Sequence, residues 1–76
     1  MEINGFIKNL ADQFNDADAS KINAETNFRD IEGYSSLVAL SIVSMVDEEY
    51  KVRLRGDDFR SAITVGDLFN HVKAKI

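Results

Sequence analysis

The stretch from Ser36 to Lys51 contains neither glycine nor proline, the two residues that most readily interrupt a helix. Its polar residues recur at helical spacing and form one stripe: Ser41, Ser44, Asp47, Glu48 and Lys51. Most other positions in the stretch are apolar. The pattern predicts a helix from Ser36 to about Lys51 that is central to the fold and mostly buried.

Two further helices are predicted, one near each end of the chain. Apolar residues three or four positions apart predict a helix from about Ile3 to Asn15, with these residues on one face: Ile3, Phe6, Ile7, Leu10 and Phe14. Near the C-terminus, Thr64 followed three residues later by Asp67 resembles a capping box. The helix that begins there is expected to direct four residues inward: Val65, Leu68, Phe69 and Val72.

The residues between the first two helices lose the helical pattern. From Asp16 to Ser35 the sequence is rich in Asn, Asp, Ala, Ser and Thr, and only Ile22, Phe28 and Ile31 are placed to hold it to a core. We expect a long loop that includes a helical turn or two. Loops of this length in small domains are often functional.

A shorter connector follows the central helix. Val52 to Arg55 are expected to be extended, with side chains alternately buried and exposed, up to Gly56. Asp57 to Arg60 are expected to form one short helical turn. The predicted fold is all-α: residues 1–76 form one domain, a small four-helix bundle with three principal helices, one short helix and a long loop between helices one and two.

Composition narrows the possible functions. With 76 residues, 45% of them hydrophobic, and no cysteine, the chain depends on packing for stability and cannot form a disulfide or a thiolate metal site. Its net charge of −4 argues against nucleic acid and favours partners with basic patches. The N-terminal residues lack the pattern of a signal peptide, and no window approaches the roughly 18 apolar residues of a membrane span. We expect a soluble, cytoplasmic monomer.

Catalytic and metal sites find little support in the sequence. Asp16 to Ser20 begins like a calcium loop, but Lys21 and Asn27 occupy the positions where such a loop needs glycine and glutamate. His71 is the only histidine, and a zinc site needs more ligands than it and Asp67 provide, so we interpret it as a surface residue. The sequence contains no Gly-x-Ser-x-Gly pattern of a serine hydrolase. We therefore predict neither a catalytic residue nor a metal ligand, and a protein that is not an enzyme.

Two adjacent serines precede the central helix. One of them is expected to be the N-cap, whose hydroxyl accepts a hydrogen bond from a free backbone N–H. With Ser35 as the cap, Ser36 becomes the first helical residue, and its side chain points outward beside other unpaired N–H groups. A phosphodiester attached to Ser36 would lie where helix termini stabilise anions.

Together with three other blocks, this turn resembles the acyl carrier protein family. Thr26-Asn27-Phe28-Arg29-Asp30-Ile31 is similar to the family's Thr-x-Phe-x-Asp-Leu segment, and Ser36-Leu37 to its attachment site. Val46-Asp47-Glu48-Glu49-Tyr50 resembles the Leu-Glu-Glu-Glu-Phe end of its second helix, at the family's spacing from the serine. Ile63-Thr64-Val65-Gly66-Asp67-Leu68 resembles the start of its last helix. The blocks span nearly the whole chain.

The resemblance implies a carrier that works through a covalent prosthetic group. Ser36 would receive 4′-phosphopantetheine from coenzyme A, through a separate phosphopantetheinyl transferase that uses magnesium. The thiol of this arm would hold acyl groups as thioesters and present them to the acyl-transfer and synthase enzymes of fatty-acid, polyketide or related lipid synthesis. The candidate partner-binding residues lie on the central helix: Leu37, Val38, Leu40, Ser41, Ser44, Asp47 and Glu48. For Leu37, Val38 and Leu40, a place in the core is the alternative.

The sequence departs from the family pattern at two places. Ser35 stands where the family has aspartate, and Arg53 and Arg55 stand where acidic residues are common. These departures favour a specialised set of partners. An aminoacyl or peptidyl carrier is one alternative, although Thr64-Val65-Gly66-Asp67 favours the acyl branch. An unmodified helical interaction module is the other, and Ser35 is the feature that favours it.

Overall fold

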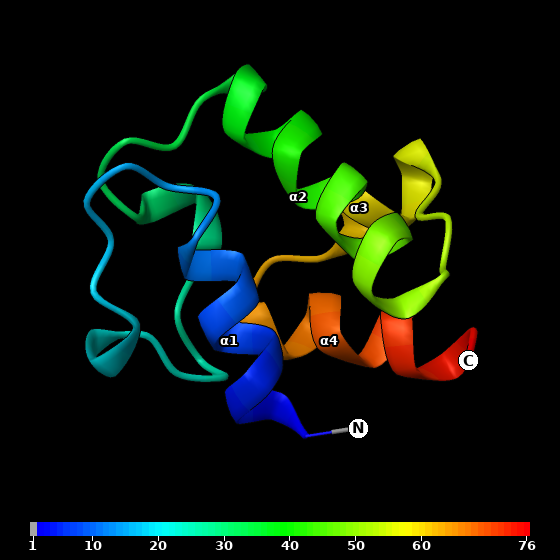
Figure 1. Ribbon diagram of the computed structural model, residues 1–76. Helices are drawn as coiled ribbons and strands as arrows, with labels where there is room; N and C mark the ends of the chain where they lie inside the picture. The colour runs from blue at the N-terminus through cyan, green and yellow to red at the C-terminus, as the bar shows by residue number, and fades with distance from the viewer. Residues whose placement is uncertain (1) are drawn as a thin grey trace.

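α2, Ser36–Tyr50, is the longest helix of the computed structural model, which describes residues 2–76. The other α-helices are α1, Ile3–Ala11, α3, Gly56–Ser61, and α4, Val65–Ala74. α1 contacts both α2 and α4, and α3 contacts α4. The segment between α1 and α2 forms the left side of the molecule in Figure 1. Within residues 2–76 all regular elements are helical, which confirms the predicted all-α bundle.

The core lies where α1, α2 and α4 meet. Its largest fully buried side chains come from all three helices and from the long loop: Phe6, Leu10, Phe28, Ile42, Val46, Val65, Leu68 and Val72. The ring of Phe6 lies 5.8 Å from that of Tyr50 and 5.5 Å from that of Phe69, so it joins α1 to the other two helices. The four residues predicted to face inward on the last helix are all buried.

α1 is shorter than the sequence predicted. It ends at Ala11 and not near Asn15, because the N–H groups of Gln13 and Phe14 bond the carbonyls of Leu10 and Ala11, three residues back. This tighter turn replaces the last turn of the expected helix. Phe14 nevertheless remains in the core with an exposed fraction of 5%.

α2 is less buried than predicted. Only Ile42, Met45 and Val46 are buried along its length, whereas Leu37 is 76% exposed and Leu40 is 65% exposed. The prediction of a mostly buried central helix is therefore wrong. Its buried residues all lie on the side that packs against the core, and none of the elements described for residues 2–76 covers the leucines. α2 ends where Lys51 adopts a left-handed conformation with φ of 58°.

The long loop contains two short 3₁₀ turns, Ala19–Lys21 and Phe28–Asp30, as expected. Its central part is joined to the start of α4, since Val65 N–H bonds the Thr26 carbonyl at 2.9 Å and Gly66 N–H bonds the Ala24 carbonyl at 2.8 Å. A Cβ atom on Gly66 would lie 2.9 Å from that Ala24 oxygen. Glycine is therefore needed at this position for the close approach of the two segments.

Thr64 and Asp67 form the predicted capping box. Asp67 N–H donates to Thr64 Oγ1 at 3.0 Å, and the Asp67 carboxylate accepts from the N–H groups of Thr64 and Ile63 at 3.1 and 3.0 Å. The backbone hydrogen bonds from Thr64 and Ile63 lower the pKa of Asp67 below its ordinary value. The box therefore fixes the start of α4.

The connector between α2 and α3 has the predicted alternation. Val52 and Leu54 are buried, whereas Arg53 and Arg55 are exposed. α3 extends one residue beyond the predicted turn at each end.

Arg29 joins the long loop to α3. Its guanidinium donates to the carbonyls of Ala62 at 2.6 Å and Phe59 at 2.8 Å, and it lies over the rings of Phe28 and Phe59. These contacts hold the C-terminal end of α3 against the loop.

Candidate functional site

Ser36 lies at the surface as the first residue of α2. Ser35 is the N-cap with an extended backbone, and its Oγ accepts a hydrogen bond from Val38 N–H at 3.3 Å. Its carbonyl accepts from Ala39 N–H at 2.9 Å. The predicted division between the two serines is therefore confirmed: Ser35 uses its hydroxyl to cap the helix, and the hydroxyl of Ser36 is not needed for that role.

The turn before the serines brings the chain from the core to the surface. Tyr34 is half-buried, and its ring lies 6.1 Å from that of Phe28 and 6.4 Å from that of Phe14. Gly33 has φ of +93°, a conformation that side chains rarely tolerate. The left-handed conformation of Gly33 and the packed ring of Tyr34 together fix the direction in which the chain leaves the core before Ser36.

A groove of about 580 Å³ begins beside Ser36. We call it the α2–α3 groove, because α2 lines one side, and the end of the connector and α3 line the other. Its residues are Tyr34, Ser36, Ala39, Leu40, Val43, Leu54, Arg55, Gly56, Phe59 and Arg60. Ser36 and Leu40 of this set were predicted from the sequence as site residues, and the opposite wall was not. The alternation from Val52 to Arg55 predicted that Leu54 is buried, but it did not predict its place in the groove.

The predicted partner-binding residues divide by exposure. Leu37, Leu40, Ser44, Asp47 and Glu48 are exposed, whereas Val38 and Ser41 are half-buried. A place in the core is therefore wrong for Leu37 and Leu40, and correct in part for Val38, which packs against the core. The exposed residues form a continuous face along α2.

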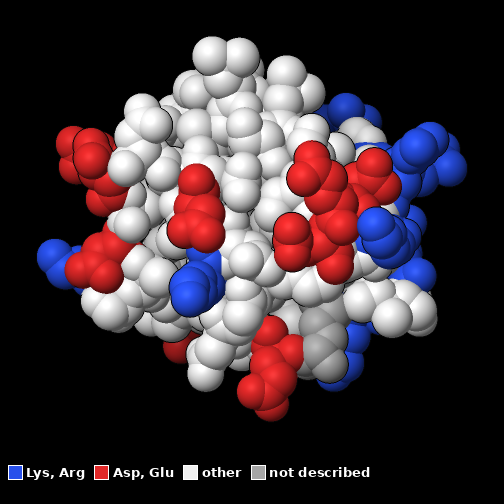
Figure 2. Space-filling model, in the orientation of Figure 1, with Lys and Arg blue, Asp and Glu red and all other residues white. Residues whose placement is uncertain are grey.

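Charge is unevenly distributed around the end of α2. Asp47, Glu48 and Glu49 are exposed in its last turn, and Lys51 and Arg53 follow in the connector. Figure 2 shows acidic side chains gathered right of centre and basic side chains along the neighbouring right edge. An acidic surface and a basic surface therefore lie next to each other on this side of the molecule.

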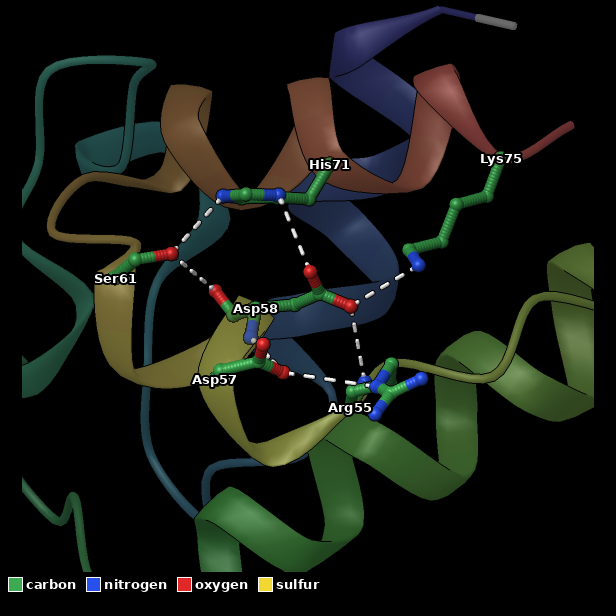
Figure 3. A network of polar contacts seen from close by, with 6 residues as sticks. All are labelled: Arg55, Asp57, Asp58, Ser61, His71 and Lys75. Carbon is green, nitrogen blue, oxygen red and sulfur yellow. Dashed lines mark hydrogen bonds and ion pairs between the residues drawn. The ribbon is translucent and has the colours of Figure 1, made fainter.

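A cluster of polar side chains away from Ser36 joins α3 to α4 (Figure 3). His71 lies between Ser61 and Asp58, with Nε2 3.4 Å from Ser61 Oγ and Nδ1 3.8 Å from Asp58 Oδ1. Lys75 Nζ lies 3.1 Å from Asp58 Oδ2, which also accepts from Arg55 N–H at 3.1 Å. The hydrogen bond from the Arg55 backbone, followed by that from Lys75, lowers the pKa of Asp58.

This cluster was not predicted from the sequence, because the fold brings its members together from the start of α3, from α3 itself and from the end of the chain. The order serine, histidine, aspartate is that of a hydrolase triad, but 3.8 Å between imidazole and carboxylate exceeds a hydrogen bond. The Ser61 hydroxyl instead donates to the Asp58 carbonyl at 3.1 Å. His71 is half-buried in this helix contact and not simply a surface residue. We interpret the cluster as a structural contact between α3 and α4.

The segment that resembles a calcium loop has a structural role. Asp18 caps the first 3₁₀ turn, with Oδ1 accepting from Ser20 N–H at 3.0 Å and from Ser20 Oγ at 2.7 Å. These hydrogen bonds lower the pKa of Asp18. In residues 2–76 no three His, Cys, Asp or Glu side chains come together in a way that would hold a metal ion.

None of the helices within the described residues has the length and hydrophobicity needed to cross a membrane.

Comparison with known proteins gives the family of the chain. The model of a family described as the phosphopantetheine attachment site matches residues 6–72, which include most of α1, all of α2 and α3, and most of α4. The chain belongs to the acyl carrier protein family.

Two relatives in this family are both named acyl carrier protein. The one from Clostridium acetobutylicum is 31% identical over 65 residues, which cover 86% of this chain and 83% of the relative. The one from Exiguobacterium is 29% identical over 59 residues, which cover 78% of this chain and 75% of the relative. In both cases most of each chain is matched.

Proposed function

We propose that the protein is a freestanding acyl carrier in which Ser36 bears 4′-phosphopantetheine, attached by a separate transferase from coenzyme A. When bound, the prosthetic group supplies a thiol that holds an acyl group as a thioester. In this proposal the protein itself is not catalytic. It carries the acyl group between the enzymes of fatty-acid, polyketide or related lipid synthesis.

The observation that carries the proposal is the different use of the two serines. The Ser36 hydroxyl is exposed at the N-terminus of a 15-residue helix, while Ser35 makes the capping hydrogen bond. A phosphodiester on Ser36 would lie at the positive end of the helix dipole, near N–H groups that have no intrahelical partner. The fit supports attachment at Ser36 without loss of the cap.

The exposed face of α2 is the proposed surface for partner enzymes. Leu37 and Leu40 offer apolar contacts close to Ser36, and Asp47 and Glu48 offer negative charge at the other end of the helix. Exposed leucines beside a polar rim are typical of interaction surfaces. The transferase and the acyl-transfer and synthase enzymes would contact this face, with Ser44 between its two ends.

Two alternatives remain distinct from this proposal. An aminoacyl or peptidyl carrier would share the attachment at Ser36 and differ in the cargo. An unmodified interaction module would share the fold without the prosthetic group, and Ser35 in place of the family's aspartate is the observation that favours it.

Intact-mass analysis tests the attachment directly. The protein is incubated with coenzyme A, magnesium and a broad-specificity phosphopantetheinyl transferase. We expect one phosphopantetheine adduct on the wild type and on Ser35→Ala, and none on Ser36→Ala. Circular dichroism of each variant checks that the helices are retained. An unmodified wild type would favour the interaction module, and an adduct that persists in Ser36→Ala would place the attachment elsewhere.

A further inference from the structure

The α2–α3 groove combines apolar walls with two arginines. Leu40 and Val43 of α2 line one side, and Leu54 and Phe59 line the other. Arg55 and Arg60 line the same groove. Both arginines are exposed, so the groove has apolar walls and a positively charged, solvated rim. A chain of hydrocarbon alone would use the walls and leave the charge of the rim without a partner.

Arg60 is the second arginine of the groove. Among the ion pairs of residues 2–76, none involves Arg60. Its Nη1 lies 3.1 Å from the point that a Cβ atom on Gly56 would occupy. Glycine at position 56 therefore leaves the room for the Arg60 guanidinium to lie close to the backbone at the start of α3, where it lines the groove.

Arg55 is only weakly engaged. Its Nε lies 3.7 Å from Asp57 Oδ1, and the two side chains are 76% and 73% exposed. Ion pairs this exposed contribute little to stability and exchange readily with other anions. Figure 3 shows the Arg55 side chain at the start of α3. Its side chain faces Asp57, whereas the hydrogen bond to Asp58 comes from its backbone N–H. Its terminal nitrogens stay free to bind an anion in the groove.

Resting on the attachment proposed above, we infer that the groove receives an acyl group whose chain ends in a carboxylate. The methylenes would lie against Leu40, Val43, Leu54 and Phe59, and the carboxylate beside Arg55 and Arg60. Ser36 lines the same groove, so an arm attached there begins at the groove and would fold back to place its cargo inside. Arginine suits this role because its planar guanidinium can bind both oxygens of a carboxylate.

The test compares two cargoes with the same number of carbon atoms. The transferase loads Ser36 from butyryl coenzyme A or succinyl coenzyme A, and intact mass verifies each product before thermal unfolding. At low salt we expect the succinyl form to have a Tm about 2–6 °C above that of the butyryl form. In an Arg55→Gln/Arg60→Gln double variant this difference is expected to vanish or reverse, because the chain carries a net charge of −4. Salt at about 1 M should reduce it as well.

Arg53→Gln is the matched control, because Arg53 is an exposed arginine of the same connector that does not line the groove. It should retain the difference between succinyl and butyryl forms. Equal Tm values for the two wild-type forms would overturn the inference and leave the carrier function intact. The double variant is also compared with the wild type when both carry the arm without an acyl group. If the substitutions lower Tm equally for the bare arm and for both cargoes, the inference is overturned, since the arginines would then bind the phosphodiester. No adduct at all would overturn the proposed function, and this inference with it.

Discussion

Ser35 stands where the family pattern named in the sequence analysis has aspartate, and its role as N-cap is one that both residues can perform. Aspartate and serine are both good N-caps, because each has a side-chain oxygen that reaches the backbone N–H groups of the first turn. The bond from Val38 N–H to Ser35 Oγ is 3.3 Å long, near the upper limit for such contacts. Serine therefore keeps the cap and loses the negative charge beside Ser36.

Substitutions of Ser35 should separate its capping role from any role in recognition. We expect Ser35→Ala to lower the free energy of unfolding by about 0.5–1 kcal/mol, because the Val38 N–H loses its partner. Ser35→Asp should preserve stability, since its carboxylate caps the helix and lies near the positive end of the dipole. Urea denaturation followed by circular dichroism measures both. An alanine variant as stable as the wild type would show that the 3.3 Å contact contributes nothing.

At the scale of elements, the sequence predicted best what depends on neighbours along the chain. The helices, the capping box at Thr64 and the alternation of the connector follow from local spacing, and all are present. The sequence failed where a contact between distant segments decides. Whether the leucines of α2 are covered depends on where the other helices lie, and a pattern of apolar residues cannot reveal that.

The candidate site shows the same limit. Ser36 and its capping neighbour could be predicted because both lie in one turn. The second wall of the groove, with Phe59 and Arg60, depends on the position of α3 beside α2. The contacts of Arg29 with Phe59 and Ala62 were missed for the same reason, since they join residues about thirty positions apart.

The contact between the long loop and α4 gives a test at this scale. A Cβ atom on Gly66 would lie 2.9 Å from the Ala24 carbonyl oxygen, which belongs to the backbone and cannot simply rotate away. We expect Gly66→Ala to destabilise the fold by about 1–3 kcal/mol, because the loop must move from its bonds with α4. Faster hydrogen exchange at the N–H groups of Val65 and Gly66 should accompany the loss.

Gly5→Ala is the control for that substitution. Gly5 lies within α1, and apart from the nearby backbone of its own helix no atom of the described residues lies within 4 Å of the Cβ position. Alanine there should stabilise the protein by about 0.5–1 kcal/mol, because it restricts the unfolded chain and favours the helix. Opposite signs for the two substitutions are expected. A Gly66→Ala variant that is as stable as the wild type would show that the loop approaches α4 less closely than in this structure.

At the scale of the whole molecule, two aspartates hold the elements of the last third of the chain together. Asp67 caps α4 next to Thr64, whose backbone pairs with that of Asn27 in the long loop. The Asp58 carboxylate binds Lys75 Nζ and accepts a hydrogen bond from Arg55 N–H, so it joins the start of α3 to the end of the chain. Both carboxylates have pKa values below their ordinary value of 3.8, chiefly because backbone N–H groups donate to them. Protonation therefore weakens the start of α4 and its contact with α3 together.

The sign of the acid response follows from these pKa values. A carboxylate whose pKa is lower in the folded than in the unfolded state stabilises the fold above its ordinary pKa, and this contribution is lost as the pH falls through the lower value. Between neutral pH and the pI of about 4.7, titration first removes the net negative charge and its repulsion. We therefore expect Tm to change little down to about pH 5 and to fall as the pH is lowered below about 4. An Asp58→Asn/Asp67→Asn double variant tests this expectation. Its Tm should be lower than that of the wild type at neutral pH and should fall less below about pH 4.

Asp30→Asn is the control, because Asp30 is exposed and lies outside both contacts. This variant should show the same fall in Tm as the wild type. Parallel Tm curves for the wild type and the double variant would show that other carboxylates govern acid unfolding.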